Sequence, residues 1–140
     1  MLDKLDFTVT LSLSNGNNSL DSNQHTYSIF IDDETVVTKT FSNKTFSSIS
    51  TVRFSVEREF GPHQFKVHYT NTQGPGSIKV ENVYVGGPSG SGVNCDNLLT
   101  RESIVIPEGR TNSLIIQSNE TYCLSYTSPF FYWVLSKFPI

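Results

Sequence analysis

The stretch of sequence that decides the fold is Asp6-Phe-Thr-Val-Thr-Leu-Ser-Leu13. Its apolar side chains stand at every second position, Phe7, Val9, Leu11 and Leu13, and threonine or serine fills the positions between them. Successive side chains of a strand point to opposite faces of a sheet, so this period of two predicts a strand with one buried and one wet face. A sheet built from such strands covers a core on one side only.

The same alternation recurs along the chain. We expect further strands at residues 25–31, 35–41, 51–57, 64–70, 77–85, 103–106, 113–117, 121–126 and 129–135. Turns are expected at 32–34, which makes a hairpin of the strands beside it, and at 60–63, and a slip of phase at Glu81-Asn82 indicates a bulge. Many short strands of this spacing predict an all-β protein, an antiparallel β-sandwich of jelly-roll-like type with nine to ten strands.

The composition agrees with this fold class. The chain has no alanine, the best helix former, and ten phenylalanines, which suit a half-buried pleated surface. A helical bundle and a doubly wound α/β enzyme are therefore excluded. The 140 residues predict a single β-sandwich domain over 1–140, in which 86–97 is a Gly/Ser-rich loop. Residues 98–140 then supply C-terminal strands that complete or extend the sandwich.

The charges exclude two classes of partner. Ten Lys and Arg against thirteen Asp and Glu give a net charge of −3, and the cations are scattered singly. A nucleic-acid binder normally carries a basic stripe, so we expect no nucleic-acid partner. We also expect no membrane partner, because no apolar run is long enough to span a bilayer. The first residues show no signal-peptide core, which predicts synthesis in a cytoplasm. In that compartment Cys95 and Cys123 are expected to be two reduced thiols, and a disulfide between them remains the alternative.

Catalytic and metal-binding motifs are scarce. None of the three histidines, His25, His63 and His68, belongs to a known catalytic or metal-ligating spacing, so we expect no enzyme and no catalytic residue. The run Asp32-Asp33-Glu34 offers hard oxygen donors on a tight turn, which are the ligands that calcium takes. An acidic hairpin turn without any ion is the simpler interpretation, and we expect no metal site.

The last expected strand is apolar on both sides. In a strand Phe130 and Tyr132 fall on one face, while Phe131, Trp133 and Leu135 fall on the other. One interpretation is a central strand covered on both faces, and the other is that one face docks onto another protein.

Two aromatic residues are candidates for stacking on a sugar, Tyr84 and Trp133. Stacking needs a ring that solvent reaches, and most aromatic side chains of this sequence fall on inward positions. For each of the two rings, a place in the core or in an interface is the preferred interpretation unless both prove exposed together.

Two resemblances bear on function. The stretches 60–71 (FGPHQFKVHYTN) and 78–87 (IKVENVYVGG), with the preceding hairpin, resemble the small β-sandwich of calcium-dependent xylan-binding modules. The stretch 128–135 (SPFFYWVL) resembles the C-terminal end of small virion-associated proteins of tailed bacteriophages. The first resemblance implies binding of a glycan with calcium as cofactor. The second implies a structural role on a virus particle.

We therefore expect a non-enzymatic accessory protein of a virion, a capsid decoration or a tail-attached module, assembled in the host cytoplasm. Its partners would be other virion proteins, in an oligomer or a lattice, contacted through Phe130, Phe131, Tyr132, Trp133 and Leu135. The alternative is a carbohydrate-binding module that recognises a cell-surface or plant polysaccharide through Tyr84 and Trp133.

Overall fold

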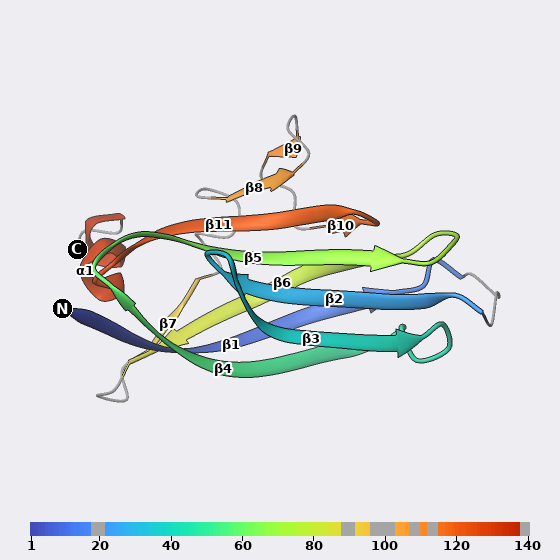
Figure 1. Cartoon of the computed structure of the whole chain (residues 1–140), viewed down its shortest axis with the longest axis horizontal. Coiled ribbons are helices and arrows are strands. Elements are labelled where there is room, and N and C mark those ends of the chain that lie inside the picture. Colours follow the sequence, from blue (N-terminus) through green and yellow to red (C-terminus); the bar gives the residue numbers. More distant parts are fainter. Residues whose placement is uncertain (18–21, 88–91, 96–102, 107–109, 112–114, 138–140) are drawn as a thin grey trace.

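The computed structural model describes residues 1–17, 22–87, 92–95, 103–106, 110–111 and 115–137. Two antiparallel sheets face each other, and a single described helix, α1 (Phe130–Lys137), lies at the end of the sandwich where the chain begins (Figure 1). The first sheet has the order β10 (Ile115–Gln117), β6 (Ser77–Gly86), β1 (Leu2–Ser14), β4 (Ile49–Glu59), with β7 (Gly92–Asn94) also paired to β6. The second has the order β3 (Glu34–Ser42), β2 (Gln24–Ile31), β5 (Gly61–Asn71), β11 (Glu120–Ser128), β8 (Ser103–Ile106), β9 (Arg110–Thr111).

The all-β sandwich is thus confirmed. Nine of the expected strands are present, and β7 and β9, of three and two residues, are additional short strands. The hairpin of β2 and β3 is also present, with the expected turn at Asp32 and Asp33. Within the described residues no helix is both long and apolar enough to cross a bilayer.

The core lies between the two sheets and is built by the predicted alternation. On β1 the buried side chains include Phe7 and Val9, while Thr8 and Thr10 between them are only half-buried. The ring of Phe7 stacks on Phe54 of β4 at 5.0 Å and on Phe65 of β5 at 5.8 Å between ring centroids. Aromatic side chains therefore join the two sheets through their inner faces.

A bulge occurs where the phase of the sequence slips. Thr10 of β1 pairs with Asn82 and Leu11 pairs with Val80, so Glu81 is the extra residue on β6. The bulge turns both Val80 and Val83 into the core, although their spacing is odd. The expected slip is confirmed.

The connection between β4 and β5 differs from the expected four-residue turn. β4 ends at Glu59, β5 begins at Gly61, and the chain crosses from the first sheet to the second at Phe60 alone. Gly61 has φ = 135°, a conformation that favours glycine over residues with a side chain. The expected turn is therefore a corner of the sandwich.

The expected strand at 129–135 is wrong, because these residues form helix α1. A short run that is apolar at every position has no period that separates a strand from a helix. In the helix Phe130 and Val134, four residues apart, are buried together, whereas Tyr132 and Leu135 are exposed. The backbone N–H of Phe130 donates to the Asp3 carboxylate at 2.9 Å, which satisfies one unpaired donor of the first turn.

The expected loop 86–97 is partly a strand, since Gly92–Asn94 pair with the end of β6, and its residues 88–91 and 96–97 lie outside the described residues. Cys95 follows β7 beside the first sheet, and its N–H donates to Val83 O at 2.9 Å. Cys123 lies on β11 in the second sheet. Both cysteines are buried thiols, and burial raises the pKa of the Cys123 thiol.

Candidate functional site

The turn between β2 and β3 is bonded firmly to β5. Asp32 has φ = 54°, and its N–H donates to Gln64 O at 2.8 Å. Its carboxylate accepts in return from the N–H of Gln64 at 3.0 Å. A short polar side chain tolerates this left-handed conformation, which is one reason why aspartate suits the position.

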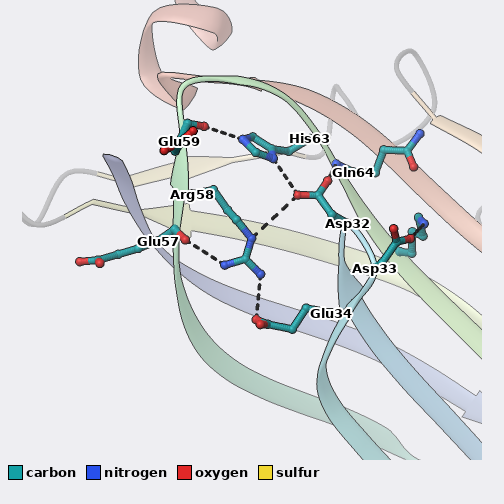
Figure 2. A network of polar contacts seen from close by, with 9 residues as sticks. Asp32, Asp33, Glu34, Glu57, Arg58, Glu59, His63 and Gln64 are labelled. Atoms are coloured by element: carbon teal, nitrogen blue, oxygen red, sulfur yellow. Dashed lines mark hydrogen bonds and ion pairs between the residues drawn. The ribbon is translucent and has the colours of Figure 1, made fainter. Parts of the chain in front are cut away.

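Arg58 of β4 joins this turn to the first sheet (Figure 2). The alternation of β4 places Arg58 on the inner side, two residues beyond buried Val56, at the end of the sandwich where α1 lies. Its guanidinium donates to Glu34 at 2.8 Å and to the carbonyl of Glu57 at 2.9 Å, and its Nε lies 3.8 Å from Asp32. One cation therefore pairs with two carboxylates that come from the same turn.

His63 completes the network at the start of β5. Its Nδ1 lies 2.7 Å from the Asp32 carboxylate, and its Nε2 lies 2.6 Å from the carbonyl oxygen of Glu59 (Figure 2). Both partners are oxygen atoms, so the imidazole ring bridges the β2–β3 turn and the end of β4. With Nε2 bonded to a backbone carbonyl, His63 has no nitrogen available in this arrangement to activate a nucleophile.

The three carboxylates of this turn do not fit a calcium ion. Asp32 and Glu34 are both bonded to Arg58, and exposed Asp33 lies 3.7 Å from the ammonium of Lys66. Calcium takes six to eight oxygen ligands that converge on one point, whereas Asp32 and Glu34 converge on a guanidinium and Asp33 lies beside a different cation. Within the described ranges, no group of three or more His, Cys, Asp and Glu side chains is arranged to hold a metal.

A cleft lies beside the network, between α1 and the second sheet. Its volume is about 540 Å³. The walls come from the β2–β3 turn, the start of β5, the end of β11 and one side of α1. They consist of Asp32, Asp33, Pro62, His63, Gln64, Lys66, Ser125, Tyr126, Thr127, Trp133 and Lys137. We call this cavity the helix cleft.

Tyr126 lies at the inner wall of the helix cleft. Its ring packs on His63 at 5.7 Å and against Phe130 of α1 at 5.7 Å. Burial raises the pKa of its hydroxyl above the ordinary range, and the negative charge of Asp32 raises it further. Among the described residues this hydroxyl has no hydrogen-bond partner. The inner wall of the helix cleft is therefore aromatic and uncharged, whereas most of its other lining residues are polar.

The expected interface residues have different surroundings on α1. Trp133 lines the helix cleft, and Phe130 is buried in the core. Phe131 packs over Gly87, where a Cβ would come within 2.7 Å of its ring. Tyr132 and Leu135 are 77% and 56% exposed. The five side chains therefore do not form one face.

The two expected stacking residues are not brought together. Tyr84 lies on β6 of the first sheet, 40% exposed, with its hydroxyl over Gly92, whereas Trp133 faces the second sheet. Apart from Asp32 and Asp33, the polar walls of the cleft were not identified from the sequence. Arg58, which contacts the turn without lining the cleft, had a usable signal, because continuing the alternation of β4 places a cation on the inner face. Gln64 and Lys66 had none, since outward polar residues are ordinary on a strand.

A second polar cluster is buried at the opposite end of the sandwich, where β2 begins and β5 ends (Figure 1). His25 Nδ1 lies 2.7 Å from the Tyr69 hydroxyl, and His25 Nε2 lies 2.9 Å from the Asn43 side-chain oxygen. The His25 ring also stacks on Phe46 at 4.1 Å. Burial raises the pKa of Tyr69 to about 12. The side chains of this cluster are buried and bonded to one another, as in a structural polar network.

Comparison with known proteins gives a similar fold. The chain matches no protein-family model and no curated protein. A solved structure described as vCBM60 in complex with galactobiose is similar over 87% of this chain and 97% of that chain, with 16% sequence identity and a TM-score of 0.48. The likeness is one of fold.

Proposed function

We propose that this protein is a non-catalytic carbohydrate-binding module and that the helix cleft is its binding site. The observation that carries the proposal is the combination of side chains in one cavity: the indole of Trp133 opposite Asp32, Asp33, Gln64 and Lys66. A sugar ring has apolar C–H faces and an edge of hydroxyl groups. An aromatic ring contacts such a face, while carboxylate, amide and ammonium groups accept from or donate to the hydroxyls.

The rigidity of the site supports the same proposal. Asp32 is held by His63, by the backbone of Gln64 and by Arg58, so its carboxylate is oriented before any ligand arrives. A group that is already ordered loses little conformational entropy on binding. The cleft therefore combines a fixed acceptor, Asp32, with a longer and adjustable donor, Lys66.

Calorimetry with defined oligosaccharides tests this function. Xylobiose, xylotriose and galactobiose would be titrated into the purified chain, first with calcium and then with a chelator. We expect saturable binding that the chelator does not change, because the nearby carboxylates are bonded to Arg58 and Lys66. Absence of binding to every sugar of a broad glycan panel would refute the proposal.

Variants locate the site. Trp133→Ala is expected to abolish binding, and Gln64→Ala, which keeps the backbone bonds of that residue, is expected to weaken it several-fold. Tyr84→Ala is the matched control, because this exposed aromatic lies on the other sheet. Wild-type affinity in both cleft variants, or loss of binding in the control, would place the site elsewhere. Circular dichroism establishes that each variant is folded.

A second candidate function is structural: a virion accessory protein, assembled in the host cytoplasm, that docks onto other virion proteins. The observation that favours it is the set of exposed apolar side chains at the α1 end, Tyr132, Leu135 and Phe60. Exposed apolar side chains at one end of a domain are typical of protein contacts. Paired substitution Tyr132→Ser and Leu135→Ser is expected to abolish any self-association seen by light scattering. A strictly monomeric wild-type chain that binds no particle protein would contradict this candidate.

A further inference from the structure

The helix cleft continues into a second cavity on the outer face of the second sheet. This cavity measures about 320 Å³ and shares Asp32, Asp33 and Lys66 with the helix cleft. Its other walls are Phe30 of β2, His68 of β5 and Thr121 of β11. Because three side chains line both cavities, the two form one groove, which we call the sheet groove.

The strand register fixes the direction of the sheet groove. Phe30 pairs with Lys66 on the neighbouring strand, and His68 pairs with Thr121 on the other side. Gln64, Lys66 and His68 alternate with buried residues of β5, so all three point outward. Gln64 and His68 are four residues apart, which corresponds to roughly 13 Å along a strand. The groove is thus longer than a single sugar ring.

Phe30 is the unusual residue of this face. Its neighbours Ile29 and Ile31 are fully buried, so Phe30 points outward, where it is half-buried beside the hydrophilic side chain of Ser28. A large apolar ring on the polar face of a sheet is informative, whereas a buried one is ordinary. It lies directly across from Lys66, the donor shared by both cavities.

We propose that the sheet groove binds a linear oligosaccharide of at least two linked sugars, with Phe30 as a second stacking ring beyond Trp133. The inference rests on the proposed function and deepens it, because it identifies an oligosaccharide as the ligand and excludes a single terminal sugar. Lys66 and Asp33 lie between the two rings and supply a donor and an acceptor to the hydroxyls near the linkage. His68 is held at 2.8 Å by Thr121 and forms the far wall.

Affinity measured against chain length tests this inference. Xylose, xylobiose, xylotriose and xylotetraose, and the corresponding β-linked galactose series, would be titrated calorimetrically. For the wild type we expect affinity to rise by about tenfold or more from one unit to three, equivalent to about 1.4 kcal/mol. Phe30→Leu, which keeps the apolar bulk without the ring, is expected to remove most of that rise. Thr26→Ala, on the same face of β2 outside both cavities, is the matched control.

The outcomes separate this inference from the proposed function. If sugars bind through Trp133 with an affinity that does not depend on the length of the oligosaccharide or on Phe30, binding along the second cavity is refuted and the module function stands. If no sugar binds, both are refuted. A readout independent of affinity is the amide NMR spectrum. Xylotetraose is expected to shift the signals of Phe30 and His68, which line only the second cavity, while xylose does not, and identical shifts with both sugars would also overturn the inference.

Discussion

Replacing Arg58 by methionine tests whether this cation stabilises the contact between the two sheets at the α1 end of the sandwich. Methionine keeps the apolar stem and removes the guanidinium, which donates to Glu34 and Glu57 and lies beside Asp32. Hydrogen bonds to charged groups contribute about 1.5–3 kcal/mol each when buried. Here the Arg58 side chain is 22% exposed and its partners Asp32 and Glu34 are 39% and 65% exposed, so solvent screens most of that contribution. We expect a loss of about 1–2 kcal/mol in the free energy of unfolding for the whole set of contacts.

The assay is urea unfolding followed by fluorescence, with the slope m unchanged because the surface exposed on unfolding stays the same. For a domain of this size the loss corresponds to a fall in Tm of roughly 3–6 °C. Arg53→Met is the matched control, since Arg53 lies on the same strand with its side chain in solvent, and its change should stay within about 0.5 kcal/mol. Equal losses in the two variants would refute the role given to Arg58. So would undiminished sugar binding by Arg58→Met, because Asp32 would then not depend on its cation.

Three further predictions concern stability. Tyr69 has a folded-state pKa of about 12 against an ordinary value of 10.0. The contribution of its neutral form to the free energy of unfolding is therefore complete below pH 10 and is lost between pH 10 and 12. Urea titrations should show roughly 2–3 kcal/mol less stability at the upper end, a loss that Tyr69→Phe lacks. Tyr126→Phe removes a hydroxyl that has no described partner and should leave the free energy of unfolding unchanged or raise it by about 1 kcal/mol, whereas a loss would reveal a partner. On α1, Phe130→Ala should cost about 3–5 kcal/mol and Leu135→Ala less than about 0.5. Equal costs for these two would contradict the buried and exposed faces of the helix.

The sheets were predictable from the sequence because their strands have one wet face. On β1, β2 and β5 the alternation separates buried from outward residues almost without exception, and even the extra Glu81 of β6 appears as a slip of phase. The end of the chain was not predictable in this way. From Phe130 to Leu135 every residue is apolar, so no period distinguishes the helix from a strand. The carboxylate of Asp3 that binds its first turn is 127 residues away in the sequence.

The site was only partly predictable, for a related reason. The acidic turn and Trp133 are visible as a local cluster and as a single residue, and both line the helix cleft. The sequence does not show that Arg58 neutralises the turn, because the contact joins β4 to β2 across the two sheets. Nor does it show that Phe30 lies across from Lys66 of β5. Those relations depend on how the strands pair and how the sheets are stacked, and a pattern within one strand carries no information about them.

The most direct test of the central claim uses the one tryptophan of the chain. Trp133 is the sole indole in the sequence and lines the helix cleft, so its fluorescence reports on that site alone. Titration with xylotriose or galactobiose should give a saturable change in the intensity or emission maximum of Trp133, with the same midpoint as calorimetry. A sugar that binds by calorimetry and leaves the emission unchanged would contradict binding in the helix cleft.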